Sequence, residues 1–491
     1  MKKIILSIAV IAAASATAFA GGYLTNTNQN VAFLRQPARN ATIGVEGAYF
    51  NPAGIGFMNN GWHFGLDIQS VRQRRYAETT FAPFAYGVEN NGKDTKKFTG
   101  KTFAPAIPHL DVAYVHNNWF ASFHFGVMAG GGEADYDDGL GSFEAPIAML
   151  PALINKISGA TTVSGYAADI NFVGEQYSFG GQFNFGYKFN SHLSASAGLR
   201  LNYVNNSYEG GIYNINLKYG GNMLPAAQVL GGIISSVSGG KIDAAQGTSM
   251  AGKIVGDKEL NCKQTDFAYT PIVSVHYETG KFDFAARYEF RTKVALENDT
   301  EINTTGIAQY NDGLTVRNDI PAMLAVGGQY KILPSLRFSL GYNLFFDKQT
   351  KQFGDKQDYI DNNTWEGLAG LEYDINKSFT VSCGVNTTTY GYTDAYISDM
   401  NLTTDSFNIG VGGKYNINDR MSVDVAFYKS FYSDYTKTSD DYAGVGHTYY
   451  TALSSMASLF PGLTEDALKT PGTETYSRNS FVIGVGFNIS F

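Results

Sequence analysis

The C-terminal stretch SFVIGVGFNISF (residues 480–491) alternates between two kinds of side chain. Large apolar residues occupy every second position: Phe481, Ile483, Val485, Phe487, Ile489 and Phe491. The positions between them are small or polar, apart from Val482. A period of two predicts a β-strand with one apolar face, which can meet either a protein core or lipid.

The same alternation recurs upstream, where segments 175–189 and 193–204 are separated only by a hairpin-length connection. Fourteen such segments are expected, near residues 62–74, 108–117, 119–130, 175–189, 193–204, 266–278, 282–293, 318–331, 335–346, 364–374, 378–389, 406–416, 420–431 and 480–491. Six short turns alternate with seven long connections, as in a transmembrane antiparallel β-barrel and unlike a soluble sandwich. The predicted fold class is therefore all-β, a barrel of fourteen strands.

The composition narrows the classes of protein further. Aromatic residues reach 14% and charged residues only 16%, which excludes intrinsic disorder. A net charge of −8 gives no general attraction for the phosphates of nucleic acid. No nucleic-acid partner is expected.

The first twenty residues have the features of a secretory signal peptide. Lys2 and Lys3 precede an apolar stretch, and Ala18-Phe19-Ala20 forms a cleavage site, so the mature chain is expected to begin at Gly21. No later run approaches ~18 apolar residues. With the barrel assigned to residues 62–491, the expected location is the outer membrane of a Gram-negative cell.

Residues 21–61 precede the first strand and do not alternate. They contain Asn51-Pro52-Ala53-Gly54, in which Pro52 restricts the backbone and the Asn51 side chain can bond nearby backbone groups. With this motif, the strand pattern and the terminal Phe491, the chain resembles the FadL/OmpP1/TodX family of outer-membrane transporters for hydrophobic compounds. A plain turn leading into the first strand is the simpler interpretation of the motif alone.

The resemblance implies that residues 21–61 form a hatch inside the barrel. It implies passive uptake of hydrophobic small molecules, such as long-chain fatty acids, by capture at the loops, binding in the lumen and movement of the hatch. It also implies a monomer that contacts outer-membrane lipid and lipopolysaccharide and meets the barrel-assembly machinery through Phe491. A porin for polar solutes, or a structural or adhesive barrel, is the alternative, and haem stays open as a ligand.

Two long connections contain apolar stretches that fit amphipathic helices, at residues 146–157 and 223–234, and a third stretch spans 453–460. Candidate ligand-binding residues are Met149, Leu150, Leu153, Ile154, Leu224, Val229, Leu230, Ile233, Arg287 and Arg337. Exposed apolar patches normally mark binding sites, although these loops can equally pack on one another to close the barrel. A lumen arginine can receive a substrate carboxylate, although most buried barrel charges are structural.

Strand parity assigns a set of charged or ionisable side chains to the lumen, because charges facing lipid are costly. The set comprises Asp67, His124, Arg200, His276, Asp283, Arg287, Glu289, Arg337, Glu366, Glu372, Lys414 and Asp424. Arg287 with Glu289, and Arg337 with Glu366, are the expected ion pairs. The glycine-rich stretch 126–132 is the candidate for a kink that opens a lateral exit, or for the start of a loop.

No residue pattern indicates catalysis, a metal or a cofactor. The histidines lack metal-binding spacing, Cys262 and Cys383 are expected to be separate thiols, and residues 239–241 do not complete a phosphate loop. Acidic residues between 133 and 138 fit solvated loop charge better than a cation site. The protein is not expected to be an enzyme.

Overall fold

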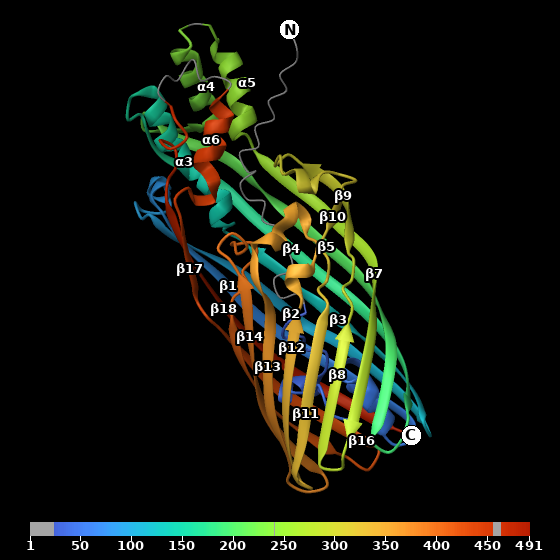
Figure 1. Cartoon of the computed structure of the whole chain (residues 1–491). Helices are drawn as coiled ribbons and strands as arrows, with labels where there is room; N and C mark the ends of the chain where they lie inside the picture. Colours follow the sequence, from blue (N-terminus) through green and yellow to red (C-terminus); the bar gives the residue numbers. More distant parts are fainter. Residues whose placement is uncertain (1–23, 240, 455–462) are drawn as a thin grey trace.

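The computed structural model describes residues 24–239, 241–454 and 463–491. The described residues form one closed antiparallel sheet, in which β1 pairs with both β2 and β18 (Figure 1). The strands are β1 (Gly61–Phe81), β2 (Thr95–His116), β3 (Trp119–Tyr136), β4 (Val163–Lys188), β5 (Leu193–Tyr219), β6 (Asn222–Pro225), β7 (Lys258–Glu278), β8 (Phe282–Glu289), β9 (Ala295–Asn303), β10 (Thr315–Arg317), β11 (Met323–Leu333), β12 (Leu336–Phe345), β13 (Ile360–Asp374), β14 (Phe379–Tyr392), β15 (Ser406–Asn416), β16 (Met421–Tyr432), β17 (Tyr435–Ser439) and β18 (Gly472–Ser490).

The described part of the chain confirms a barrel wall of fourteen strands. β8 and β9 both pair with β7 and make one wall strand in two pieces. In the same way, β10 continues β11 and β17 continues β16. The short β6 pairs only with the far end of β5.

The predicted strands end correctly at the short turns, and most of them stop too early at the other end. The strands expected at 335–346 and 406–416 match β12 and β15, whereas those expected at 282–293 and 318–331 extend past the end of β8 at Glu289 and the start of β11 at Met323. The strand expected at 193–204 continues to Tyr219, and residues 75–107, expected as a connection, hold the ends of β1 and β2. Beyond the membrane both faces of a strand can be polar, as in Asn205-Asn206, so hydrophobic alternation fades while backbone pairing continues.

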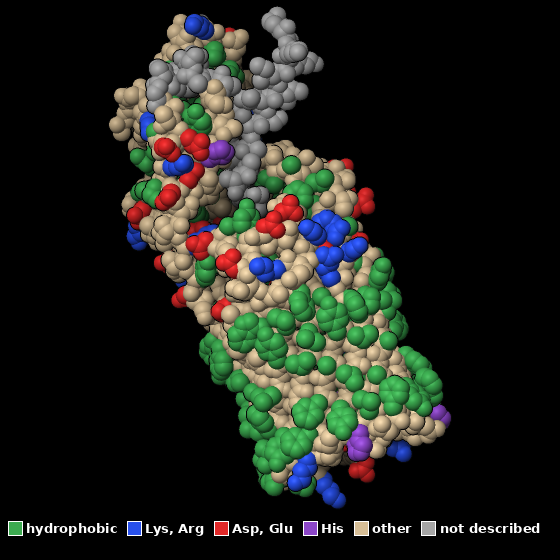
Figure 2. Space-filling model, viewed as in Figure 1, with side chains coloured by type: hydrophobic (Ala, Val, Ile, Leu, Met, Phe, Trp, Pro, Cys, Tyr) green, Lys and Arg blue, Asp and Glu red, His purple; other side chains and the backbone are tan. Residues whose placement is uncertain are grey.

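The lower part of the barrel carries a broad band of apolar side chains (Figure 2). Val485 and Phe487 of β18 point outward with exposed fractions of 51% and 39%, whereas Val482 is buried. Trp62 and Trp119 stand exposed beside the short turns, and Trp119 packs edge-to-face against Tyr187. An outward apolar band with aromatic edges is the surface that a lipid bilayer requires.

The opposite face of the wall carries the charges that parity assigned to the lumen. Asp67, His124, Arg200, His276, Asp283, Arg287, Glu289, Glu366, Glu372 and Asp424 are all buried. Lys414 and Arg337 line a cavity in the lumen. Strand parity therefore predicted this set correctly.

Helices gather on the long-connection side of the barrel (Figure 1). They are α3 (Gly141–Ser158), α4 (Ala226–Val237), α5 (Ala244–Val255) and α6 (Val445–Ser454). Five 3-10 helices accompany them: η2 (Ala82–Tyr86), η3 (Ala308–Tyr310), η4 (Asp347–Gln349), η5 (Phe353–Tyr359) and η6 (Tyr442–Gly444). The helix expected at 146–157 is confirmed as part of α3. The helix expected at 223–234 begins only at Ala226, because residues 222–225 pair with β5 as β6.

Two segments expected from the sequence lie partly or wholly outside the described residues. The apolar stretch 453–460 reaches them only at Leu453 and Ser454, which end α6. The signal peptide at residues 1–20 lies wholly outside them. Within the described residues, no helix is long and apolar enough to cross a membrane.

The segment of residues 24–57 packs against the inner side of the wall (Figure 1). It contains α1 (Val31–Arg35), α2 (Gly47–Phe50) and η1 (Pro52–Phe57). α1 contacts β15, β16 and β18, and η1 contacts β4, β5 and β7, so the segment touches opposite stretches of the sheet. We call residues 24–57 the N-terminal segment.

The two faces of β18 predict different responses to a charge. Val485→Arg places a guanidinium in the middle of the outward apolar row and is expected to lower the free energy of unfolding in lipid vesicles by about 2–4 kcal/mol. Thr475→Arg, on the same strand beyond the apolar band, is the matched control, with an expected change within about 0.5 kcal/mol. Equal losses in urea titrations of both variants would contradict the assignment of the lipid face.

Candidate functional site

The Asn51-Pro52-Ala53-Gly54 motif forms a capped turn inside the barrel. The Asn51 side chain caps η1 by accepting a hydrogen bond from the Gly54 amide (3.2 Å), and its Nδ2 donates to the Thr42 carbonyl (3.0 Å). The same Nδ2 lies 3.0 Å from Nδ1 of His276 on β7. Asn51 therefore joins two parts of the N-terminal segment to the wall.

The next residue of the motif completes this attachment through its backbone. The Ala53 amide donates to Oγ of Ser274 on β7 (2.9 Å), and its carbonyl accepts from Oγ of Ser194 on β5 (2.6 Å). The motif thus has a definite structural role, that of holding the N-terminal segment to two neighbouring strands near their short turns.

A second attachment is built around Tyr49 of α2. Its ring lies between the guanidinium groups of Arg200 and Arg287, whose Cζ atoms are 5.0 and 4.7 Å from the ring centroid. Arg200 donates to Gln182 and makes a two-point contact with Glu289 (2.6 and 2.8 Å). Arg287 donates to the Tyr49 carbonyl and lies 3.3 Å from Glu289, which confirms the expected Arg287–Glu289 pair.

A third attachment is a buried charge network at α1. Arg35 contacts Glu372 at 2.6 Å and Asp424 at 2.9 Å, while Arg39 pairs with Glu46 and lies 3.3 Å from Glu372. All five side chains are nearly inaccessible to solvent. Buried charges need such partners, because an unpaired one is strongly destabilising.

The expected pair of Arg337 with Glu366 is wrong. The register of β12 and β13 places Arg337 opposite Glu372, and its guanidinium binds Asp374 in a two-point contact (2.6 and 2.8 Å). Glu366 lies opposite Asn343 and accepts a hydrogen bond from it. Parity predicted the direction of both side chains, but the partner depends on strand register.

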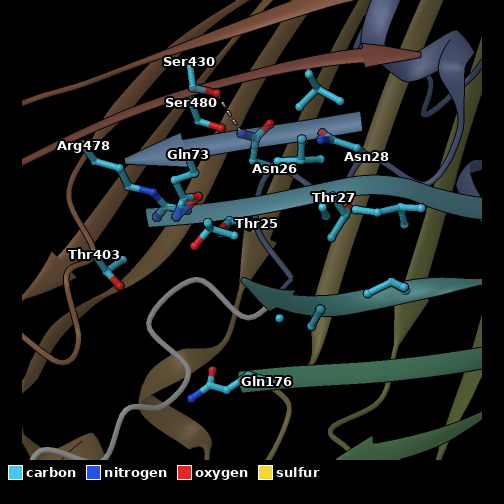
Figure 3. Close-up of a pocket in the computed structure, with 18 of the residues that line it drawn as sticks. Thr25, Asn26, Thr27, Asn28, Gln73, Gln176, Thr403, Ser430, Arg478 and Ser480 are labelled. Carbon is cyan, nitrogen blue, oxygen red and sulfur yellow. Dashed lines mark hydrogen bonds between the residues drawn. The ribbon is translucent and has the colours of Figure 1, made fainter. Parts of the chain in front are cut away.

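A cavity of about 250 Å³ lies in the lumen on the long-connection side of these attachments (Figure 3). Its floor is the start of the N-terminal segment, residues 25–29, and its walls come from β1–β4, β14–β16, β18 and the connection at residues 400–403. The labelled lining side chains of Figure 3 are polar, namely Thr25, Asn26, Thr27, Asn28, Gln73, Gln176, Thr403, Ser430, Arg478 and Ser480. Val71, Ile107, Val127, Met128 and Val482 supply apolar surface.

The wall beside this cavity is interrupted between β2 and β3. Their ladder is regular from the pair Leu110 and Phe125 to the pair His116 and Trp119, next to the short turn. Toward the long connections, the one further pair between the two strands is Lys101 with Asp135. Residues 102–109 of β2 and residues 126–134 of β3 are therefore not paired with each other by backbone hydrogen bonds. Pro105 and Pro108 cannot donate to a ladder.

The glycine-rich stretch 126–132 lies on the β3 side of the interruption. Gly130 has a φ of +116°, and the register between β3 and β4 shifts on both sides of Ala129. A Cβ on Gly130 would lie 2.1 Å from the Gln176 carbonyl oxygen, so this bulge requires glycine. The expectation of a bend is confirmed, whereas the start of a loop is wrong because β3 continues to Tyr136.

The N-terminal segment bonds to backbone at the interruption. Nε2 of Gln29 donates to the Val127 carbonyl (2.7 Å), and its Oε1 lies 3.2 Å from Nε2 of His124. His124 bonds to Asp111 (2.7 Å), which also accepts from Asn30 (2.7 Å). A continuous chain of hydrogen bonds thus connects residues 29 and 30 to β2 and β3.

A larger cavity of about 600 Å³ lies toward the short turns and is rich in charged groups. Its lining includes Arg35, Arg39, Glu46, Lys331, Arg337, Glu372, Asp374, Lys414, Asp419, Arg420 and Asp424. Such a surface suits water and ions and offers little to an apolar molecule.

The loop residues expected to bind ligand lie in an extracellular hydrophobic cluster. Met149, Leu150, Leu153, Ile154, Val229 and Leu230 are buried, and Leu224 and Ile233 pack against them. None of them lines the cavities described above. The packing alternative considered from the sequence accounts for their burial.

A small apolar cavity of about 30 Å³ lies next to this cluster. It is lined by Phe143, Phe172, Gly210, Gly211, Ile212, Lys258, Leu260, Thr305, Ile307, Tyr310 and Met400. Burial lowers the pKa of Lys258, the single charged side chain in this lining. The ten neighbours of that lysine in the lining carry no charge.

The described residues hold no cluster of three His, Cys, Asp or Glu side chains fit for a metal ion. In the acidic stretch, Asp137 pairs with Lys101 at 3.0 Å. Cys262 is buried and Cys383 exposed, and both are free thiols as expected.

Comparison with known proteins gives one partial sequence match and several structural ones. A family model described as putative MetA-pathway of phenol degradation matches residues 317–442. No curated protein matches the chain.

Among solved structures, a Pseudomonas aeruginosa FadL homologue superposes with a TM-score of 0.62 at 11% identity, covering 96% of this chain and 100% of that one. The Pseudomonas putida toluene transporter TodX gives 0.54 at 13%, covering 92% and 96%. The Ralstonia pickettii toluene transporter TbuX gives 0.50 at 13%, covering 92% and 95%.

A closed wall of fourteen strands with an outward apolar band defines a transmembrane β-barrel of the outer-membrane type. The fold is that of the FadL homologue and of TodX over almost the whole chain. Identities of 11% and 13% show a shared fold and leave function to the site itself.

The attachment at Asn51 can be tested separately from the barrel. Asn51→Ala removes three side-chain contacts and is expected to cost about 1–3 kcal/mol in the local stability of the N-terminal segment. Amide hydrogen exchange at residues 42–57 is predicted to speed up, with β12–β15 unaffected. Asn59→Ala, at an exposed position next to η1, is the control and should leave exchange unchanged. Unchanged protection in Asn51→Ala would refute the attachment.

Proposed function

We propose that this protein is an outer-membrane channel for passive uptake of hydrophobic small molecules, such as long-chain fatty acids or similar compounds. The observation that carries the proposal is the interruption between β2 and β3 beside the lumen cavity. Residues on both of its edges, Ala104 and Ile107 on β2 and Val127 and Met128 on β3, line that cavity. A molecule held there adjoins the wall at the place where the wall lacks its ladder.

Entry would begin at the extracellular cluster. The small apolar cavity next to the buried cluster, lined by Phe143, Phe172 and Ile212 among others, would be the first apolar site above the barrel. Apolar burial of about 25 cal/mol per Å² would supply most of the binding energy. Met149, Leu150, Leu153 and Ile154 are buried, and they would act by packing the cluster beside this cavity.

Exit sideways into the membrane is favoured over exit through the barrel. The cavity toward the short turns is lined by charged groups, among them the paired Arg35, Arg39 and Glu372. An apolar molecule would have to displace water and ion pairs to pass. The route past Ala104 and Val127 would open on release of the Gln29 contact to the Val127 carbonyl.

Residues 21–61 would serve as the hatch, with the N-terminal segment as its main described part. Gln29 and Asn30 hold the segment to β3 and β2, while the Asn51 motif holds its other end to β5 and β7. Release would involve the Gln29 contact, with the Asn51 attachment kept. The protein would act as a monomer, in contact with outer-membrane lipid and lipopolysaccharide, with Phe491 available to the assembly machinery.

Narrowing the interruption tests the proposed exit. Ala104→Trp places a large ring on β2 at the edge of the interruption. Each variant is expressed in cells that lack their own fatty-acid uptake, and uptake of a radiolabelled fatty acid through Ala104→Trp is expected to be severalfold lower than through the wild-type protein. Ala121→Trp, on the regular part of the β2–β3 ladder, adds the same ring outside the interruption and should keep wild-type uptake. Equal uptake by the two variants would count against a lateral exit.

Liposome swelling separates this function from a porin. Because the N-terminal segment occupies the lumen, sugars should not enter proteoliposomes at rates above those of empty vesicles. Swelling in sugar comparable to that given by a general porin would favour the porin instead.

A further inference from the structure

Two arginines face each other across neighbouring strands at the upper lumen cavity. Arg75 of β1 and Arg478 of β18 are direct partners in the register, and both line the cavity. Like charges placed directly opposite destabilise a sheet, and a guanidinium cannot lose its charge at any accessible pH. This pair of charges therefore calls for an anion.

The described residues supply no carboxylate to either arginine within 4.0 Å. The ion pairs of the described chain involve other arginines, lysines and histidines. Glu474, also on β18, pairs with Lys437, and Asp399 accepts hydrogen bonds from Ser142. In contrast to Arg35, Arg200 and Arg337, the two facing arginines have no ionic partner there.

The surroundings hold the two guanidinium groups in place without neutralising them. Arg478 lies beside Gln73 (Figure 3) and donates to its Oε1 (2.6 Å). The Arg478 guanidinium also lies over the Tyr432 ring, 4.6 Å from its centroid. Arg75 is paired with Gly100 in the β1–β2 register, and the Tyr136 ring lies over Gly100. Tyr136 fits there because Gly100 leaves room, since a Cβ on Gly100 would come within 2.4 Å of the ring.

Several donors around the pair are left without a partner. Nε of Arg75, Nε of Arg478 and Nε2 of Gln73 are buried and form no hydrogen bond in the described structure. Oγ1 of Thr102, which also lines the cavity, has none either. Buried donors are normally satisfied, so this group has the composition of a site for an oxygen anion.

We propose that Arg75 and Arg478 bind the carboxylate of an amphiphilic ligand whose apolar chain extends toward the β2–β3 interruption. This inference rests on the proposed function and narrows its substrate class. A neutral hydrocarbon would leave the two charges uncompensated, whereas a carboxylate accepts hydrogen bonds from both guanidinium groups. Val71, Ile107 and Val127, on the same cavity, provide surface for the chain.

Calorimetric titration of the full-length protein in a neutral detergent tests this assignment. The probes are decanoate and decanol, which share a chain and differ in charge. Decanoate is expected to bind about 10- to 100-fold more tightly than decanol, because hydrogen bonds to a charged group contribute free energy in that range. In Arg75→Gln/Arg478→Gln the preference should disappear, with decanol binding unchanged.

Two further variants keep the test decisive. Arg74→Gln removes an exposed neighbouring charge and should leave the preference intact. Arg478→Lys keeps the charge but loses the planar fork, and is expected to retain a reduced preference. Equal binding of decanoate and decanol by the wild-type protein would overturn the carboxylate site alone. Failure to bind either probe would overturn the proposed function as well.

Discussion

One constraint governs this molecule: inside a bilayer each backbone N–H and C=O must find a partner within the protein. Closure of the sheet through β1 and β18 meets this requirement around almost the whole wall. The exception lies between β2 and β3, where the ladder is interrupted and Gln29 donates to the Val127 carbonyl. A side chain of the N-terminal segment therefore supplies a partner to one backbone group at the interruption.

The same constraint explains the lumen. Alternation that places apolar residues in lipid places the remaining side chains inside, where charges need partners. The N-terminal segment supplies them: Arg35 to Glu372 and Asp424, and the Tyr49 ring to Arg200 and Arg287. Ion pairs and cation–π contacts thus stabilise the N-terminal segment and the barrel wall against each other. Arg75 and Arg478 differ from the other lumen arginines because they have no such ionic partner among the described residues.

Much of the fold could be predicted from the sequence because alternation reports directly on lipid exposure. It located the fourteen wall strands at their short turns and the direction of the lumen charges. It could not locate strand ends above the membrane, where both faces are polar, nor the partner of Arg337, which depends on register. Arg75 was missed because it lies just past the end expected for the first strand, although Arg72, Arg74 and Arg75 form a visible cluster.

The central claim is that ligand leaves through the interruption between β2 and β3. It is tested most directly by photo-crosslinking a fatty acid with a diazirine at its tail to the protein in native outer-membrane vesicles, followed by mapping of the modified residues. The account predicts adducts at residues 102–109 and 126–130. Adducts concentrated instead on the lining of the charged cavity, such as Gln329, Thr380 and Lys414, would contradict it.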